Sequence, residues 1–367
     1  MSRPRLLILV NAFEADAPTR LMLEVARAAQ ASGRFECHMA ALSRGGPLEV
    51  EAGQVAAGAH NLAMGRWRNL AGRRRLGAFL RELGPVIVHV SLLRPTLIGT
   101  AAARLAGVPR VVITCHGTHE WGEARPFPEW LIRRMYVRAS RAADTVVGVS
   151  NAVAEELARA GVAQQKIHVI YNGVDPEWFV PGVEGRTEPE GGGFLRVGAA
   201  GNLRAVKGFE TLIRAAALVV GNGRGAGAGV EVRIWGDGPE RGRLERLIEE
   251  TGAPVRLEGR RDDLPRLLRE CDAYVQPSLR EAFGLAAAEA MACGLPVIVS
   301  DAGGLPEVAG RAEEAGGLVF PAGSEQALAE ALVRLRDDVE LRQRLAARAR
   351  SRVLAHFTRE RMTADYM

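Results

Sequence analysis

The stretch that decides the fold covers residues 277–308 and reads PSLREAFGLAAAEAMACGLPVIVSDAGGLPEV. It follows a short apolar strand pattern, AYVQ, and contains an alanine-rich run that predicts a helix. Glu281 precedes Phe283-Gly284 and Glu289 lies within the alanine-rich run, a spacing that spans about 12 Å along an ideal helix. Two carboxylates so placed, just beyond a strand, could accept hydrogen bonds from both ends of one extended ligand. The alternative is that two acids near a helix start only stabilise the helix dipole.

The whole stretch resembles the E-x(7)-E motif of family 4 retaining glycosyltransferases (glycosyl transferases group 1), with SLxExFGL before it and GxPVIxSDxGGxPEV after it. The resemblance implies the GT-B fold, an α/β architecture of two Rossmann-like doubly wound domains facing each other across a cleft. It also implies that Glu281 binds the hydroxyls of a donor sugar and Glu289 those of the ribose. The backbone around Phe283, Gly284 and Leu285 would bind the sugar and the phosphates.

A second loop that could bind a ligand covers residues 199–214 and reads AAGNLRAVKGFETLIR. A helix is expected to open near Phe209, and its free N–H groups, together with the charge of Lys207, would attract a phosphate. The loop resembles the family's G-R-L-x-x-x-K-G segment, whose basic pair binds the donor diphosphate. Asn202 stands at the usual arginine position, and Arg204 lies two residues further on, which restores the same side of an extended segment. Arg204 and Lys207 are therefore predicted to bind the diphosphate.

In the first half of the chain, ITCHGTHEW places His116 at the end of a strand. A lone histidine is more often structural than functional, but V-V-x-T-x-H-G is where the family carries a histidine that approaches the donor sugar. His119, Glu120 and Trp121 follow as predicted acceptor-side residues. Arg20 is assigned to the acceptor side as well, in a loop that lacks the Gly-Gly many members have there. The predicted catalytic residues are therefore His116, Lys207 and Glu281.

Short apolar strands alternate with amphipathic helices along the whole chain, a pattern that predicts doubly wound parallel sheets. The strand candidates are residues 5–10, 36–42, 86–90, 110–116, 144–150, 167–174, 194–201, 230–237, 255–259, 273–277, 296–301 and 316–320. A stretch rich in Pro, Gly and Glu interrupts the alternation. We therefore predict an acceptor-side domain at 1–180, a linker at 181–193 and a donor-binding domain at 194–367. The resemblance suggests that the last helix returns to the first domain.

Composition excludes several classes of protein. With 367 residues, 47% of them hydrophobic and 25% charged, the chain has globular values and room for two cores. Its four cysteines are scattered, which favours a reducing, cytoplasmic compartment over a zinc site or a disulfide framework. No apolar run approaches the roughly 18 residues of a membrane span, and no G-x-G-x-x-G fingerprint indicates a nicotinamide cofactor. No D-x-D cluster stands ready to hold a cation, so neither a metal nor another cofactor is expected.

The positive charge lies in the first half, where residues 1–180 contain 22 Arg and Lys against 15 Asp and Glu. The remainder contains 26 against 28. Much of the excess falls in 65–76 and 128–138, where Trp and aliphatic residues are interleaved with Arg. Such segments favour docking on an anionic membrane surface, so a peripheral location on its inner face is one prediction. A solvated arginine-rich face is the alternative, and nucleic acid is disfavoured because no nucleic-acid-binding motif accompanies the charge.

The resemblance therefore indicates a metal-independent hexosyltransferase that moves a sugar from a nucleotide diphosphate to a glycan or glycolipid acceptor. It implies that the anomeric configuration is retained. Synthesis of cell-surface polysaccharide or glycolipid is the expected setting. Two alternatives remain open at this point. One is the same fold with another reaction, such as a sugar-nucleotide epimerase or a soluble disaccharide synthase, and the other is a non-catalytic nucleotide-sugar binding protein.

Overall fold

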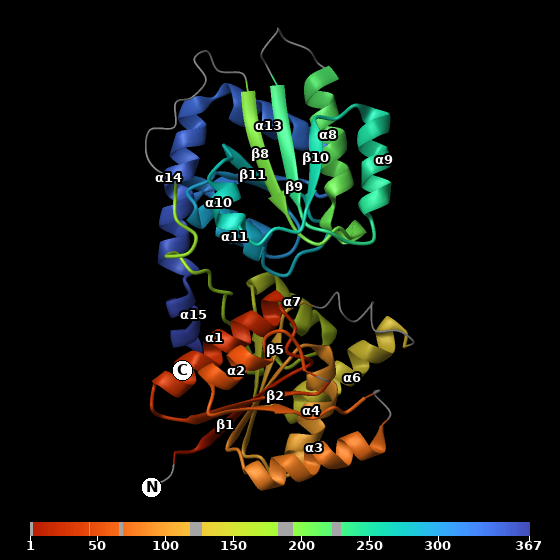
Figure 1. Cartoon of the computed structure of the whole chain (residues 1–367), viewed down its shortest axis with the longest axis vertical. Helices are drawn as coiled ribbons and strands as arrows, with labels where there is room; N and C mark the ends of the chain where they lie inside the picture. Colours follow the sequence, from red (N-terminus) through yellow and green to blue (C-terminus); the bar gives the residue numbers. More distant parts are fainter. Residues whose placement is uncertain (1–2, 44, 66–68, 118–126, 183–193, 222–228) are drawn as a thin grey trace. The chain divides into compact units, whose positions relative to one another are not determined.

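The computed structural model describes residues 3–43, 45–65, 69–117, 127–182, 194–221 and 229–367 (Figure 1). The chain divides into two compact units, Met1–Asn172 with Glu360–Met367, and Gly173–Arg359. This division differs from the expected one at residues 173–180, which belong to the second unit, whereas residues 360–367 return to the first unit as the resemblance suggests. The reason is local pairing: the Val174 N–H donates to the Phe357 carbonyl and the Arg359 N–H to the Val174 carbonyl. Most of the expected linker, 181–193, lies outside the described residues.

The first unit is built on a seven-stranded parallel sheet with the order β3-β2-β1-β4-β5-β6-β7. Its strands are β1 (Arg5–Val10), β2 (Glu36–Ala41), β3 (Gly58–Asn61), β4 (Ile87–Ser91), β5 (Arg110–Cys115), β6 (Thr145–Gly148) and β7 (Ile167–Val169). Its helices are α1 (Ala17–Ala31), α2 (Glu49–Val55), α3 (Leu70–Leu83), α4 (Leu93–Leu105), α6 (Glu129–Ala142), α7 (Asn151–Ala160) and α15 (Arg359–Tyr366).

The second unit has a six-stranded parallel sheet with the order β10-β9-β8-β11-β12-β13. Its strands are β8 (Phe194–Ala200), β9 (Gly229–Trp235), β10 (Val255–Gly259), β11 (Ala273–Gln276), β12 (Val297–Ser300) and β13 (Gly317–Phe320). Its helices are α8 (Phe209–Gly221), α9 (Arg241–Thr251), α10 (Leu264–Leu268), α11 (Leu285–Ala292), α12 (Leu305–Ala309), α13 (Glu325–Asp337) and α14 (Val339–His356). The predicted pair of doubly wound α/β domains is thereby confirmed.

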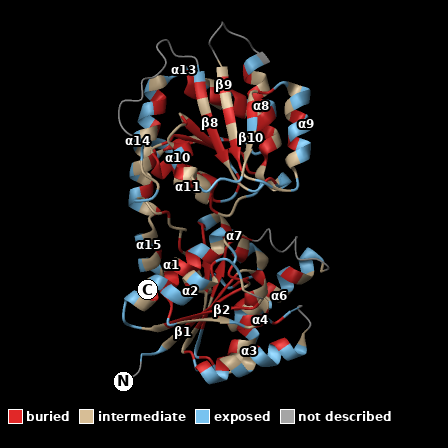
Figure 2. Ribbon diagram, in the orientation of Figure 1, coloured by how far each residue is buried: buried red, intermediate tan, exposed pale blue. Residues whose placement is uncertain are grey.

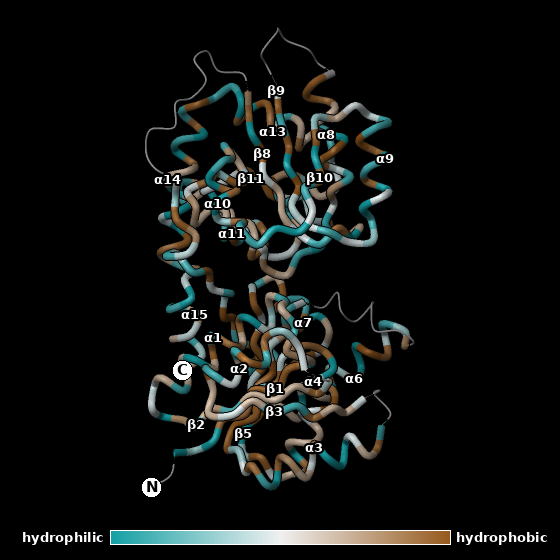
Figure 3. The backbone as a smooth tube through the Cα atoms, viewed as in Figure 1, coloured by the Kyte–Doolittle hydropathy of each residue, from teal (hydrophilic) through white to brown (hydrophobic). Residues whose placement is uncertain are grey.

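The sequence explains these elements locally. Strands β11 and β12 are buried along their whole length, as expected for parallel strands with helices on both faces. Figure 2 shows buried residues along much of β8 and β9 as well. The outer helices instead have one hydrophilic and one hydrophobic side, so the two kinds of residue alternate along the helix, as α9 shows (Figure 3). Helix α7 begins where the Ser150 side chain accepts from the Val153 N–H and ends at Gly161 in a left-handed conformation, the cap that its sequence predicts. The short edge strand β3 escaped prediction because GAHN carries no apolar run.

The strand orders determine where ligands can bind. In each sheet the winding direction reverses once, between β1 and β4 in the first unit and between β8 and β11 in the second. Loops that leave two such neighbouring strands diverge to opposite faces and open a crevice at the carboxyl ends of the strands. Within the described part of the chain, no helix is both long and apolar enough to cross a membrane.

Candidate active site

The reversal point of the second sheet brings together the two loops that the sequence singles out. Lys207 ends a short 3-10 turn, Ala205–Lys207, in the loop after β8. The following residue, Gly208, has φ 66°, and a Cβ on it would lie 2.0 Å from the Pro277 carbonyl oxygen in the loop after β11. Only glycine permits this approach. As a result, Lys207 Nζ lies 2.8 Å from Glu281 Oε2.

The Glu281 carboxylate is held by three donors on one oxygen. Besides Lys207, Oε2 accepts from Gln276 Nε2 at 2.8 Å and from Ser278 Oγ at 3.1 Å. Gln276 and Ser278 are buried, and the Glu281 side chain is only 14% exposed. Its other oxygen, Oε1, has no hydrogen bond to the described residues and can accept one from a ligand hydroxyl. The arrangement orients this carboxylate before any ligand arrives.

The backbone around Gly284 is shaped by close contacts rather than by side chains. Gly284 precedes α11 with φ 106°, and a Cβ there would lie 2.4 Å from Leu305 Cδ2. Phe283 is 2% exposed and packs edge-on against Phe357, with ring centroids 5.4 Å apart. Its side chain therefore belongs to the core, and only its backbone can serve a ligand. Leu285 opens α11, whose first N–H groups have no partner within the helix.

Glu289 lies in the second turn of α11 and is half-buried. Burial raises the pKa of its carboxyl group to about 8, because the charged form loses hydration. Within the described residues, this carboxylate has no hydrogen-bond or ion-pair partner. It therefore differs sharply from Glu281, which is already paired. A ligand that donates hydroxyl hydrogen bonds would supply what Glu289 lacks.

Arg204 is exposed and precedes the turn that carries Lys207. It lines a small hollow of about 140 Å³ together with Gly208, Thr211 and Arg243. The structure thus places Arg204 on the same loop as Lys207, and its predicted contact with a diphosphate stays a prediction.

His116 directly follows β5, the strand next to β4 and one strand beyond the reversal point of the first sheet. It is buried, and its Nε2 lies 2.9 Å from the hydroxyl of Ser91, the last residue of β4. Burial lowers the pKa of His116 to about 3, and the neighbouring His89 lowers it further in the same direction. The imidazole is therefore neutral at physiological pH. The neutral ring can donate or accept one hydrogen bond with a ligand, but it cannot act as a cation.

Of the predicted acceptor-side residues, Arg20 lies exposed in the first turn of α1, just beyond β1. Its N–H donates to the Asp16 carbonyl within this turn. His119, Glu120 and Trp121 lie outside the described residues.

Arg94 is a candidate site residue that sequence reasoning missed. Its guanidinium reaches the loops after three strands, with hydrogen bonds to Ser43 Oγ at 2.9 Å, to Asn11 Oδ1 at 3.4 Å and to the Gly65 carbonyl. Its Nε is buried without a partner among the described residues, and burial lowers the pKa of the group. Leu92 nearby has φ 74°, which is costly for a side chain of its size. The signal available was an arginine in SLLRP directly after a strand.

Comparisons with known proteins agree on one family. The profile "Glycosyl transferases group 1" matches residues 189–352, and the profile "Glycosyltransferase Family 4" matches residues 19–178. The MMP alpha-(1->4)-mannosyltransferase of Mycolicibacterium hassiacum is 31% identical, over 73% of this chain and 67% of its own length. The sulfoquinovosyl transferase SQD2 of Arabidopsis thaliana is 28% identical over 77% of this chain. The match spans 56% of SQD2, and 42% of the N-acetyl-alpha-D-glucosaminyl L-malate synthase of Bacillus anthracis.

Solved structures show the fold. HepE of Anabaena, solved in complex with UDP, has a TM-score of 0.82 and 20% identity, covering 99% of this chain and 98% of that one. The sucrose-phosphate synthase of Thermosynechococcus elongatus has a TM-score of 0.82 and 22% identity, covering 99% and 97%. Both cover the two units with the paired Rossmann-like architecture predicted from the sequence. The chain is a member of glycosyltransferase family 4, the group 1 glycosyl transferases, and has the GT-B fold.

Proposed function

We propose that the protein is a retaining, metal-independent hexosyltransferase that moves a sugar from a nucleotide diphosphate to a glycan or lipid-linked acceptor. The observation that carries the proposal is the pair formed by Lys207 and Glu281 at the reversal point of the second sheet, with the unpartnered carboxylate of Glu289 on the adjoining helix. The pair offers a cation for phosphate and an oriented acceptor for hydroxyl groups, and Glu289 offers a second acceptor. A nucleotide sugar presents the matching groups, namely a diphosphate, sugar hydroxyls and ribose hydroxyls.

The leaving nucleotide diphosphate gains negative charge as the glycosidic bond breaks. The Lys207 ammonium, the Arg204 guanidinium and the N–H groups that open α8 would stabilise this charge without a metal ion. Glu281 would bind the sugar through its free oxygen, and Glu289 the ribose. Solved relatives support a nucleotide donor, since HepE of Anabaena was solved with UDP and with UDP-glucose.

Retention is part of the proposal, and the engagement of the carboxylates bears on the route by which it would occur. Glu281 is bound to Lys207, Gln276 and Ser278, which leaves its charge poorly disposed to attack an anomeric carbon. Neutral His116 would hydrogen-bond a sugar hydroxyl rather than carry charge. We therefore favour front-face substitution, in which the acceptor attacks from the side of the departing diphosphate. Closure around the donor would exclude water and limit hydrolysis.

The acceptor class is proposed from the relatives that this chain resembles. One relative, LpsE of Rhizobium meliloti, is named a lipopolysaccharide core biosynthesis glycosyltransferase and is 34% identical over 44% of this chain. We place the protein in the same broad setting, the synthesis of cell-surface polysaccharide or glycolipid, on the cytoplasmic face of the membrane. Arg20 and Arg94 would face the acceptor, since both follow strands that border the reversal point of the first sheet.

Calorimetric titration tests the donor site directly. Purified protein is titrated with UDP, GDP and ADP, each in EDTA and in magnesium. Tight binding of one nucleotide in EDTA is the expected result, and it would name the base. Binding that requires magnesium would overturn metal independence, and no binding of any nucleotide would overturn the donor assignment. Product analysis by NMR with the nucleotide sugar so identified then reports the anomeric configuration.

A further inference from the structure

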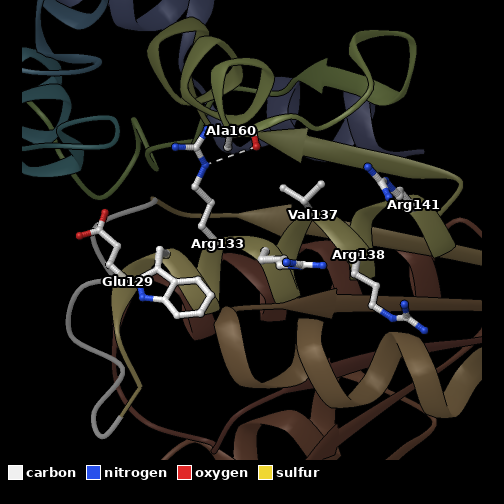
Figure 4. A pocket seen from close by; sticks show the side chains of 8 residues that line it. Glu129, Arg133, Val137, Arg138, Arg141 and Ala160 are labelled. Atoms are coloured by element: carbon white, nitrogen blue, oxygen red, sulfur yellow. Dashed lines mark hydrogen bonds between the residues drawn. The ribbon is translucent and has the colours of Figure 1, made fainter.

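Helix α6 presents a stripe of arginines to solvent. Its residues recur at intervals of one, three and four positions and therefore share one side of the helix. We call this side the α6 arginine face; it consists of Trp130, Arg133, Arg134, Arg138 and Arg141. They line a groove of about 770 Å³ that also reaches Ala160 at the end of α7 (Figure 4). Glu129 at one end is the single acid among the lining residues that the structure describes.

The charges of this face are not neutralised within the described part of the chain. Arg133 donates to the carbonyl oxygen of Ala160 at 3.4 Å (Figure 4) and to that of Arg159 at 2.7 Å. Both acceptors are uncharged, so Arg133 keeps its full charge. Arg134, Arg138 and Arg141 have no carboxylate partner among the described residues. Two exposed arginines of the second unit differ in this respect. Both Arg214 and Arg243 bind Glu210.

Large apolar side chains are exposed in the same layer of helices. Trp130 is 65% exposed, and on the neighbouring helices Leu70 is 69% and Leu105 87% exposed. Helix α4 packs against both α3 and α6, so these residues belong to one layer. A second groove of about 350 Å³ separates α3 from α4, with an apolar floor and the arginines 73, 74 and 81 along it. The layer thus combines the arginines of α6, which lack carboxylate partners among the described residues, with exposed apolar groups.

We propose that the layer formed by α3, α4 and α6 docks on a bilayer surface that contains anionic phospholipid. The arginines attract the negative surface, and the tryptophan ring and leucines enter the boundary between headgroups and acyl chains. Nucleic acid would use the charges but leave Leu70, Leu105 and Trp130 without an apolar partner. The inference rests on the membrane setting of the proposed function and deepens it, because it assigns the surface of the chain that would meet the lipid. A lipid-linked acceptor would then be met at the membrane itself.

Vesicle flotation of the full chain tests this surface. We expect binding to phosphatidylcholine vesicles that contain phosphatidylglycerol, little binding to phosphatidylcholine alone, and weaker binding as salt rises. The triple variant Arg134→Ala, Arg138→Ala, Arg141→Ala should bind on the order of a hundredfold more weakly, since each arginine near an anionic surface contributes several-fold. The matched control removes three arginines from α13 and α14, Arg334→Ala, Arg344→Ala and Arg348→Ala, and should bind like the wild type.

A separate variant tests the apolar part. Trp130→Ala should weaken vesicle binding while leaving its salt dependence intact, and Trp178→Ala, which removes a side chain of similar exposure (61%), should not. Equal binding to neutral and anionic vesicles would overturn the proposal, and so would wild-type binding by the α6 triple variant. Binding to duplex DNA but not to vesicles would assign the face to nucleic acid instead.

UDP titration of the same proteins separates this inference from the proposed function. Loss of vesicle binding with unchanged nucleotide affinity is the expected behaviour of the α6 variant. Wild-type protein that binds UDP but no vesicle would refute the docking surface alone. Wild-type protein that binds vesicles but no nucleotide would refute the donor site alone.

Discussion

At the scale of single residues, the site depends on two carboxylates that the fold treats differently. Glu281 is bound by a lysine, an amide and a hydroxyl, whereas Glu289 is half-buried without a counter-charge in the described residues. The Glu281 carboxylate is oriented before a ligand arrives, whereas the charged form of Glu289 is disfavoured until a ligand donates hydrogen bonds to it. This difference gives each residue its own test.

Lys207→Ala is expected to lower the rate of sugar transfer by roughly a hundredfold to a thousandfold, because one stabilising charge on the leaving group is lost. The fold should persist, since the Lys207 side chain is 28% exposed and belongs to no core. Steady-state kinetics and thermal melting measure the two effects. Lys166→Ala is the control, since it removes the chain's other lysine, which donates only to backbone carbonyls in the first unit. Turnover at the wild-type rate would remove the diphosphate assignment.

Glu289→Gln should alter the pH dependence of stability. The pKa of Glu289 is about 8 in the folded protein against 4.5 for an ordinary glutamate, so the folded state binds more protons between these values. The free energy of unfolding of the wild type should therefore fall as the pH rises from about 5 to 8, relative to the variant. Urea unfolding of both proteins at pH 5 and pH 8 measures this difference. Parallel pH profiles would contradict the raised pKa.

Nucleotide binding gives Glu289 a second readout. If ribose hydroxyls donate to its charged form, binding favours ionisation, and affinity should rise as the pH approaches 8. Calorimetry of the free nucleotide across this range should show proton release in the wild type and none in Glu289→Gln. An affinity of Glu289→Ala for the free nucleotide equal to that of the wild type would count against the ribose contact.

At the scale of elements, the site is created by two loops that touch at a glycine. Gly208→Ala would place a Cβ against the Pro277 carbonyl oxygen and should force the β8 and β11 loops apart. We expect nucleotide binding to weaken at least tenfold and stability to fall by about 1–3 kcal/mol or more. Gly252→Ala is the matched control, because its φ of 63° is similar but its Cβ would meet nothing within 4 Å. It should cost about 1 kcal/mol and leave binding unchanged. Equal effects of the two variants would show that backbone strain alone is responsible.

At the scale of the whole molecule, the chain's last residues complete its first unit. The Tyr366 hydroxyl lies 3.1 Å from Thr114 Oγ1, which in turn lies 2.7 Å from His89 Nε2. Met362 on the same helix is 2% exposed. Helix α15 thus stabilises the parallel sheet of the first unit.

Met362→Ala should therefore destabilise the first unit by about 2–5 kcal/mol, the usual range for removing a buried methionine side chain. Calorimetric unfolding with and without UDP measures this, since nucleotide should stabilise the transition of the second unit. The transition that UDP does not shift should move to lower temperature in the variant. A shift confined to the UDP-sensitive transition would contradict the assignment of α15 to the first unit.

The sequence by itself determined the elements and the chemistry of the motifs. Period and capping residues located the strands and helices, because these depend on neighbours in the chain, and the E-x(7)-E stretch with Lys207 identified the family. Only the tertiary structure decided which groups meet. Lys207 and Glu281 are 74 residues apart and become partners because β8 and β11 are adjacent in the sheet, an order that no local pattern encodes. The hydrogen bonds of the Arg94 guanidinium and the pKa of Glu289 likewise arise from burial and long-range packing, which are properties of the assembled fold. For the return of residues 360–367 to the first unit, the family resemblance gave the suggestion and long-range packing supplies the physical cause.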